Sequence, residues 1–199
     1  MIELLVATMV LAIAVLIGLP ELRHFYIRLQ METYVLDLSS SISKTRYEAI
    51  KRGLDTVVKA DWTNRRFYMF LDQPVFDASG ARTDTPWVFT PGEDEFLYGF
   101  LLPKDVEFAS PAGLDAVEGL SDPVGADVME DRVAIFMSDG SVQDVGSFRL
   151  GDPRTNFVQV AFNPQATGRV RLEKWDCVNH RWLDRADRWD WYTKAQSGC

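Results

Sequence analysis

The sequence predicts an α+β protein, in which one long N-terminal helix precedes a head made of a mostly antiparallel β-sheet. Three observations predict this class: residues 4–19 are an uncharged apolar run, a helical apolar period continues beyond it, and a period of two begins after Gly53. The 199-residue chain has a net charge of −8 and two cysteines. About 145 residues follow Gly53, which is enough for one hydrophobic core.

The first element is the apolar run, which lies between Glu3 and Pro20. As a helix, at about 1.5 Å per residue, it would be about 24 Å long, shorter than the roughly 30 Å hydrocarbon core of a bilayer. A signal peptide would have basic residues before the run and a small-residue cleavage site after it. The run has an acid before it and Pro20 after it, so we expect residues 1–20 to be a retained transmembrane half of the helix.

Glu3 is unusual because a carboxylate held centrally in a bilayer costs on the order of 2–3 kcal/mol. Two interpretations stay open on the residues alone. Either Glu3 has an oppositely charged partner in an assembly, or it simply lies among the lipid headgroups.

Residues 21–53 are expected to continue the helix as an amphipathic half packed on the head. One stripe of this half carries Leu22, Phe25, Tyr26, Leu29, Thr33 and Leu36. Pro20 lacks an amide N–H and clashes with the preceding turn, so we expect a kink or a melted turn near residues 18–20. Gly53 follows a basic segment and predicts the end of the helix.

The head, residues 54–199, is predicted from short segments of alternating apolar and polar residues separated by turn signals. The expected strands are residues 56–59, 65–72, 87–90, 96–102, 106–108, 132–137, 141–145, 156–162 and 168–174. Residues 110–130 are rich in proline, glycine and acids, and we expect them to form a surface excursion.

The N-terminal residues resemble the N-terminal motif of type IV pilins and type II secretion system pseudopilins. Residues 2–5 match its Ile-Glu-Leu-Leu core, and Pro20 lies at the family's distance from the glutamate. The family's glycine, methylated aromatic and threonine are missing, so we expect the site cut by a prepilin peptidase to lie upstream of Met1. The resemblance implies that Glu3 pairs with the N-terminal amine of a neighbouring subunit and that Pro20 belongs to the assembly helix.

Three further blocks resemble the GspH/FimT branch of this family. They are SKTRYEAIKRG at residues 43–53, RVAIFMSDGSV at 132–142 and FNPQATGRVRL at 162–172. The resemblance implies a structural minor pilin or minor pseudopilin that helps to initiate or cap a type IV pilus or a type II secretion pseudopilus. It also implies a single-pass protein of the bacterial inner membrane, with its head in the periplasm and its helix packed against other subunits.

Cys177 and Cys199 are the only cysteines. An even count in an exported head favours a disulfide, which would close a loop of about twenty residues and contribute about 3 kcal/mol in the chain-entropy model. Free thiols are one alternative. A metal site with His180 is another, but it lacks a fourth ligand and the spacing of zinc sites. Many pilins carry a C-terminal disulfide loop, so the resemblance also implies a Cys177–Cys199 bond.

The tail, residues 168–199, holds four of the six tryptophans. Seven basic and five acidic residues give it a charge of +2, which leaves −10 for the rest of the chain. Such a segment can bind nucleic acid through phosphate contacts and base stacking, and Arg169 and Arg171 match the Gly-Arg-x-Arg that is implicated in DNA uptake in the FimT part of the branch. The alternating charges favour the other interpretation, in which the arginines pair with aspartates and the tryptophans pack on the sheet.

The sequence contains no motif typical of an enzyme. His24 and His180 are placed where they form no base–nucleophile pair, and phosphate-binding, dinucleotide-binding and zinc-protease motifs are missing. Residues 77–84 resemble a calcium loop, but Arg82 and the incomplete ligand spacing favour a plain turn. We therefore expect no enzymatic activity, no cofactor and no metal. A periplasmic binding module with a simple membrane anchor is a third class, and it would not need Glu3.

Overall fold

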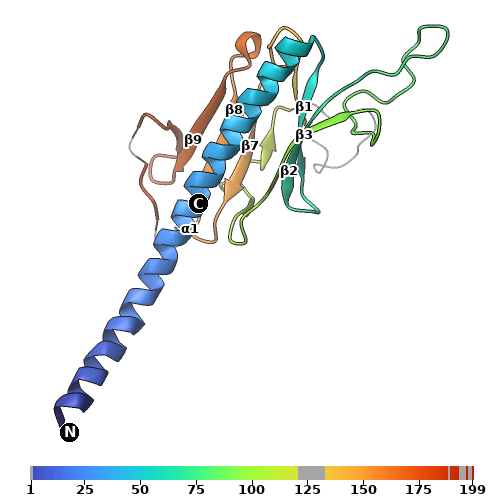
Figure 1. Ribbon diagram of the computed structural model, residues 1–199. Coiled ribbons are helices and arrows are strands. Elements are labelled where there is room, and N and C mark those ends of the chain that lie inside the picture. The colour runs from blue at the N-terminus through green and yellow to red at the C-terminus, as the bar shows by residue number, and fades with distance from the viewer. Residues whose placement is uncertain (1, 121–132, 188, 193–195, 197–198) are drawn as a thin grey trace.

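In the part of the chain that the structure describes, a long helix precedes two antiparallel sheets (Figure 1). The computed structural model describes residues 2–120, 133–187, 189–192, 196 and 199, with the backbone alone at residues 2, 5, 14, 17, 18, 20 and 21. Residues 121–130 of the expected surface excursion, and Arg188 and Lys194 of the tail, lie outside the described residues.

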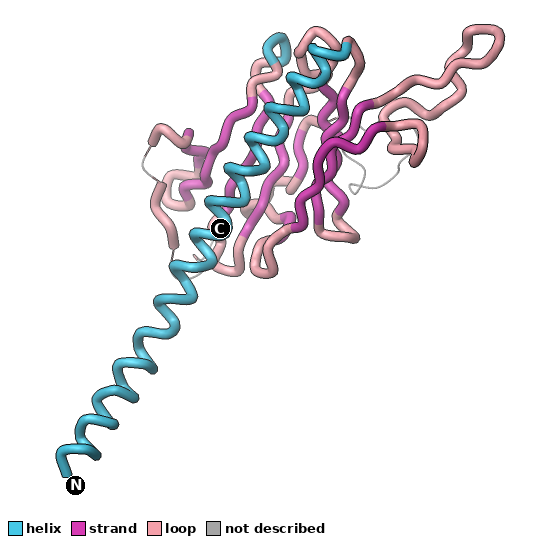
Figure 2. Tube along the Cα trace, viewed as in Figure 1, coloured by secondary structure: helices cyan, strands magenta, loops and turns pink. Residues whose placement is uncertain are grey.

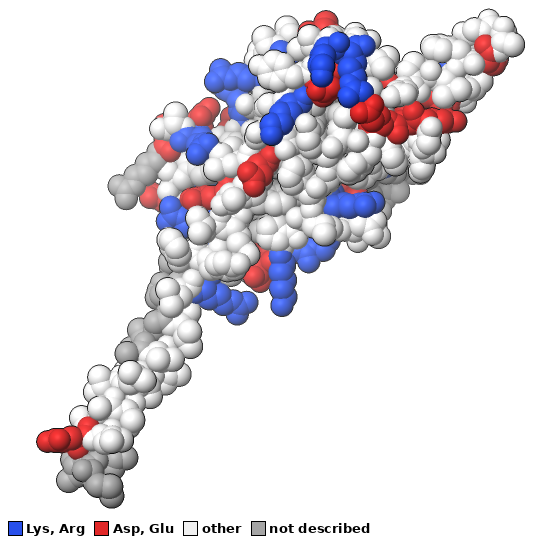
Figure 3. Space-filling view, viewed as in Figure 1, with Lys and Arg blue, Asp and Glu red and all other residues white. Residues whose placement is uncertain are grey.

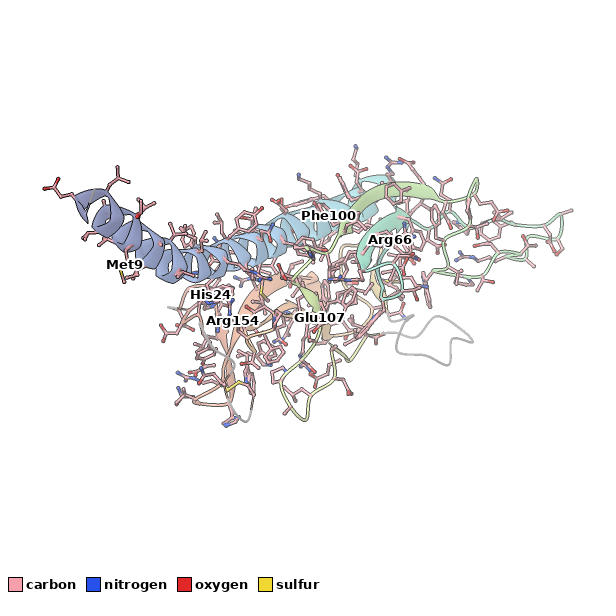
Figure 4. All side chains as sticks on the ribbon, turned by 90° about the horizontal axis from the view of Figure 1, so that it is seen from below. Met9, His24, Arg66, Phe100, Glu107 and Arg154 are labelled. Carbon is pink, nitrogen blue, oxygen red and sulfur yellow. A yellow bond between two sulfur atoms is a disulfide. The ribbon has the colours of Figure 1, made fainter. Side chains whose placement is uncertain are left out.

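Helix α1 runs from Ile2 to Arg52. It ends where the sequence predicts, because Gly53 adopts φ +67° and its amide donates to the carbonyl of Ala49 at 2.9 Å. The expected melted turn near Pro20 is wrong, since α1 is continuous through residues 18–20. A proline removes one intrahelical hydrogen bond, which bends a long helix without ending it, and Figure 4 shows α1 changing direction between the labelled Met9 and His24.

The strands form two sheets in which all neighbours are antiparallel. The first sheet has the order β3-β2-β1-β6, with β1 Thr56–Asp61, β2 Arg66–Leu71, β3 Glu95–Leu101 and β6 Val133–Phe136. The second has the order β10-β9-β8-β7-β4, with β4 Glu107–Phe108, β7 Gly146–Gly151, β8 Phe157–Phe162, β9 Val170–Asp176 and β10 Arg181–Asp184. Strand β5, Val117–Glu118, also pairs with β7.

The core lies between the second half of α1 and the sheets, which α1 crosses (Figures 1 and 2). The buried residues of the helix follow the helical period and are Ile27, Met31, Tyr34, Val35, Leu38, Ser41, Ile42, Thr45 and Ala49. Phe67 of β2 meets Phe148 of β7 edge to face, with ring centroids 5.2 Å apart, so the aromatic core joins the two sheets. The predicted α+β class is confirmed.

The apolar stripe that begins at Leu22 is not the face of α1 that the head buries. Leu22, Phe25, Tyr26 and Leu29 are 47–66% exposed, and Leu36 packs partly against the core. The head therefore covers one face of the helix and leaves a second apolar face in the open.

Two expected strands are wrong. Residues 87–90 do not form a strand, because Trp87 adopts φ 62° and the Asp94 carboxylate accepts a hydrogen bond from the Thr90 amide at 2.7 Å. Residues 141–145 contain only an isolated bridge at Val142, and the strand begins at Gly146. Side-chain hydrogen bonds and turns compete with sheet formation in both segments.

Candidate functional site

The first half of α1 projects away from the head, and Glu3 lies in its first turn (Figure 1). The Glu3 side chain is exposed, and Figure 3 shows acidic atoms at the free end of the helix. Among the described residues no basic side chain pairs with this carboxylate. A helix N-terminus stabilises an exposed carboxylate by about 0.3–1 kcal/mol. A stronger partner for Glu3 would have to come from elsewhere.

The side chains that follow Glu3 form an apolar surface along the projecting helix. Leu4, Leu11 and Leu16 are 68–73% exposed, and the surface continues into Leu22 and Phe25. Figure 3 shows this part of the helix as nearly free of charged atoms. Soluble monomers seldom expose a contiguous apolar surface of this extent. Within the described residues, no helical segment is both long and apolar enough to cross a membrane.

Pro20 lies inside α1, between the projecting half and the half that contacts the head. It is 17 residues from Glu3, which corresponds to about 26 Å along a helix. The structure therefore does not bring the two predicted assembly residues together within one chain.

The cysteines are joined as predicted. Cys177, which follows β9, forms a disulfide with Cys199, with their Cα atoms 5.8 Å apart. Cys177 is buried in a small cluster with Phe157 and Trp175 at one end of the second sheet. The disulfide fixes the end of the chain to this sheet.

The segment that leads to the second cysteine is what we call the C-terminal strap. Its described residues include Trp189, Trp191, Tyr192, Gln196 and Cys199 itself. Trp189 and Trp191 pack against the core beside α1. The Tyr192 amide donates to Asn156 Oδ1 at 2.8 Å, and Asn156 Nδ2 donates to the Tyr192 carbonyl at 3.0 Å. The strap thus connects the helix side of the second sheet to the disulfide.

Beneath the strap lies a buried lysine that the sequence analysis missed. Lys174 is 2% exposed, and its Nζ lies 4.6 Å from the ring centroid of Tyr192 and 5.4 Å from that of Trp191. Burial lowers the pKa of Lys174 to about 8, and nearby aspartates offset this shift only in part. Alternation along β9 could have indicated its place, because Lys174 shares a face with buried Leu172.

Arg169 directly precedes β9, and Arg171 is the second residue of that strand. Arg169 is exposed, whereas the Arg171 Nε is buried without a hydrogen-bond partner among the described residues. The nearest carboxylate oxygen, from Asp184, is 4.0 Å from that nitrogen. Trp175 is buried and packs edge to face on Trp182, with centroids 5.2 Å apart, so Trp175 does not offer a free face for base stacking.

A second polar group missed by sequence reasoning lies beside Arg171. Arg149 of β7 is 3% exposed, donates to Gln159 Oε1 at 3.0 Å and pairs with Glu118. Gln159 in turn donates to Glu173 at 2.5 Å. These side chains border the same hollow as Arg171, of about 380 Å³, and the two carboxylates oppose the approach of a phosphate chain. The group comes from four strands, so no local motif reveals it.

The segment from residue 77 to 84 is a turn. Asp77 Oδ1 accepts from the Ser79 hydroxyl at 2.6 Å and from the amides of Ser79 and Ala81 at 2.8 and 3.0 Å, and these hydrogen bonds lower the pKa of its carboxyl. Arg82 pairs with Asp72 at 2.7 Å and with Asp84, and this clamp closes the base of the loop. In the described part of the chain, no group of three or more His, Cys, Asp or Glu is arranged to hold a metal ion.

Comparisons with known proteins give a weak structural similarity. No protein-family model matches the sequence, and no curated protein is significantly similar to it. Among solved structures, the minor pseudopilin EpsH from the Type 2 Secretion System of Vibrio cholerae matches with a TM-score of 0.40 and 15% identity, over 71% of this chain and 94% of that chain. A similarity this weak carries no functional argument for this chain.

Proposed function

We propose that this chain is a structural subunit, a minor pilin or minor pseudopilin, of a type IV pilus or type II secretion pseudopilus. The first half of α1 is held in the bacterial inner membrane, and the head lies in the periplasm. During assembly the helix leaves the lipid and packs against the helices of other subunits, at the start or the tip of the filament. The subunit performs no catalysis.

The observation that carries the proposal is the exposed apolar half of α1. Full burial of one leucine side chain contributes about 1.5–3 kcal/mol, and Leu4, Leu11 and Leu16 are all more than two thirds exposed in the single chain. Lipid or neighbouring helices would cover these side chains, while water would leave them unfavourably hydrated. The exposed stripe at Leu22 and Phe25 extends the same surface to the edge of the head.

Glu3 gives the proposal a specific test. In a helix bundle its carboxylate needs an opposite charge, and removal of one partner of a buried pair typically costs about 3–5 kcal/mol. Glu3→Ala should therefore enter the membrane as the wild type does but be recovered in filaments at less than about a tenth of the wild-type level. Glu93→Ala, at an exposed acid of the head, is the matched control.

Membrane fractionation and quantitative blotting of sheared filaments measure the two steps separately. If Glu3→Ala is incorporated as well as Glu93→Ala, Glu3 has no role in assembly. If neither the wild type nor the control is found in filaments, the chain is an anchored binding module instead.

A DNA-binding minor pilin is the second candidate function. Arg171 favours it, because its buried Nε has no partner among the described residues and exposed Arg169 lies two residues away. The double variant Arg169→Ala/Arg171→Ala should then bind DNA more weakly, with a shallower salt dependence and an unchanged circular dichroism spectrum. Arg66→Ala, at a 48%-exposed side chain on β2, is the control. Equal DNA binding by both variants would exclude this candidate.

A further inference from the structure

A cavity of about 210 Å³ lies where α1 leaves the head. His24, Phe25 and Arg28 line it from the helix, Arg154 from the turn between β7 and β8, and Trp191 and Tyr192 from the strap. Figure 4 shows the labelled His24 and Arg154 next to each other at this junction. The cavity is smaller than the roughly 300 Å³ of sites that enclose drug-sized molecules, so it suits a small polar group.

The groups around this cavity favour an anion. Three of the lining residues are basic types, whereas the acid in the lining, Asp152, is already used by its own turn. Its carboxylate accepts from the Arg154 amide at 2.8 Å and from the Asn156 amide and Nδ2, both at 2.9 Å. Of the basic residues, Arg28 pairs with Glu32 at 3.2 Å.

A second, independent observation comes from His24. Its Nδ1 is buried and has no hydrogen-bond partner among the described residues. Buried polar atoms are nearly always paired in folded proteins, so this nitrogen, in a residue that lines the cavity, lacks the partner that its burial requires. The walls are otherwise held in place, because Arg28 stacks on Trp191 at 5.4 Å and Asn156 binds Tyr192 through two hydrogen bonds.

We propose that this cavity binds the phosphate of an anionic phospholipid in the leaflet next to the head. The proposal rests on the proposed function in one respect, namely that the first half of α1 lies in lipid. His24 follows Leu19, the last residue of the uncharged run, by five residues, or about 7.5 Å along a helix. The headgroup layer of a bilayer is about 5–7 Å thick on each side, so the cavity lies at the outer edge of the headgroup layer.

The aromatic side chains support the same placement. Trp and Tyr are enriched where a protein crosses the boundary between lipid and water, and exposed Phe25 lines the cavity together with Trp191 and Tyr192 where α1 leaves the head. An acyl chain would lie along the apolar helix below the cavity, while the phosphate would accept from His24, Arg28 and Arg154.

Native mass spectrometry of the full chain, released from detergent micelles that contain equal amounts of phosphatidylglycerol and phosphatidylcholine, tests the site. The wild type should retain phosphatidylglycerol in preference. Arg154→Gln and His24→Phe should each lower that retention about tenfold, since each removes a hydrogen bond to a charged group. Arg66→Gln, which lies away from the cavity in Figure 4, should retain the lipid as the wild type does.

Equal retention of the two lipids by the wild type, or unchanged retention by both cavity variants, would overturn the proposal. Complete displacement of the lipid by an equimolar amount of inorganic phosphate would also overturn it, because the site would then be one for a free anion. Circular dichroism of the variants separates lost binding from lost folding. If Arg154→Gln does not fold, His24→Phe still tests the site, because it keeps an aromatic side chain in the wall of the cavity.

Flotation with neutral phosphatidylcholine vesicles distinguishes this proposal from the proposed function. If the wild type does not float, α1 does not enter lipid and the membrane part of the proposed function fails. If it floats and the cavity variants keep phosphatidylglycerol, only the headgroup site is wrong.

Discussion

Removal of the Cys177–Cys199 disulfide should lower the free energy of unfolding of the head by about 3 kcal/mol. The bonded residues are 22 positions apart, and a cross-link of that span restricts the unfolded chain by about this amount in the chain-entropy model. Cys177 also packs against Phe157 and Trp175, so its truncation adds a small loss of contacts. The effect should reach the strap, because Trp189, Trp191 and Tyr192 lie inside the closed loop.

Urea unfolding of the full chain in mild detergent, followed by tryptophan fluorescence, measures this loss. With a slope of about 1–3 kcal/mol per molar urea, the midpoint of Cys177→Ala/Cys199→Ala should fall by about 1–3 M. Chemically reduced wild type is the matched control and should unfold close to the double variant. A loss below about 1 kcal/mol, or a reduced wild type as stable as the oxidised protein, would refute the view that the bond fixes the strap.

Leu38→Ala should lower the free energy of unfolding by about 2–5 kcal/mol, because Leu38 is fully buried on α1; Leu29→Ala, on the exposed stripe, should change it by less than about 1 kcal/mol. Arg82→Ala should cost about 3 kcal/mol at neutral pH, because it leaves the buried Asp72 carboxylate unpaired. Burial already raises the pKa of Asp72, so this loss should shrink in acid, where Asp72 takes up a proton. Burial lowers the pKa of Lys174 from 10.5 to about 8, so between these values the unfolded chain binds more protons and stability rises with pH. The free energy of unfolding of Lys174→Met should therefore exceed that of the wild type by more at about pH 7 than at about pH 9.5, as measured by urea unfolding.

Each of these predictions has a result that would contradict it. Equal losses for Leu38→Ala and Leu29→Ala would mean that the buried face of α1 is assigned wrongly. If Arg82→Ala lowers the free energy of unfolding no more than Arg66→Ala, at an exposed ion pair, the Arg82–Asp72 pair does not stabilise the fold. A difference between Lys174→Met and the wild type that does not change with pH would show that Lys174 keeps an ordinary pKa in the folded protein.

The sequence predicted the features of this fold that depend on local chemistry. Gly53 ends α1 because a residue without a side chain takes the left-handed conformation easily, and most strands lie within a residue or two of their expected bounds. The face of α1 that packs on the head was not predictable in this way. The helix has two apolar faces, and only the shape of the sheets decides that the one with Leu38 is covered and the one with Leu29 is not.

The candidate sites also differ in whether the sequence alone could predict them. The Cys177–Cys199 bond follows from the even residue count and the expected export of the head, so the sequence was sufficient to predict it. The surroundings of Lys174 were not predictable, because its aromatic neighbours come from a strap that returns to β9 from 17 residues away or more. The cavity at His24 likewise combines a helix, a turn and the strap, which have no common sequence pattern.

In the proposed function, the exposed apolar half of α1 packs against other subunits in a filament. Photo-crosslinking from position 16, where Leu16 is 73% exposed, tests it most directly, with position 178, where Val178 is 78% exposed on the head, as the control. In sheared filaments, we predict covalent adducts with other subunits from position 16 and few from position 178. Absence of the chain from filaments, together with adducts only to lipid from position 16, would contradict the claim.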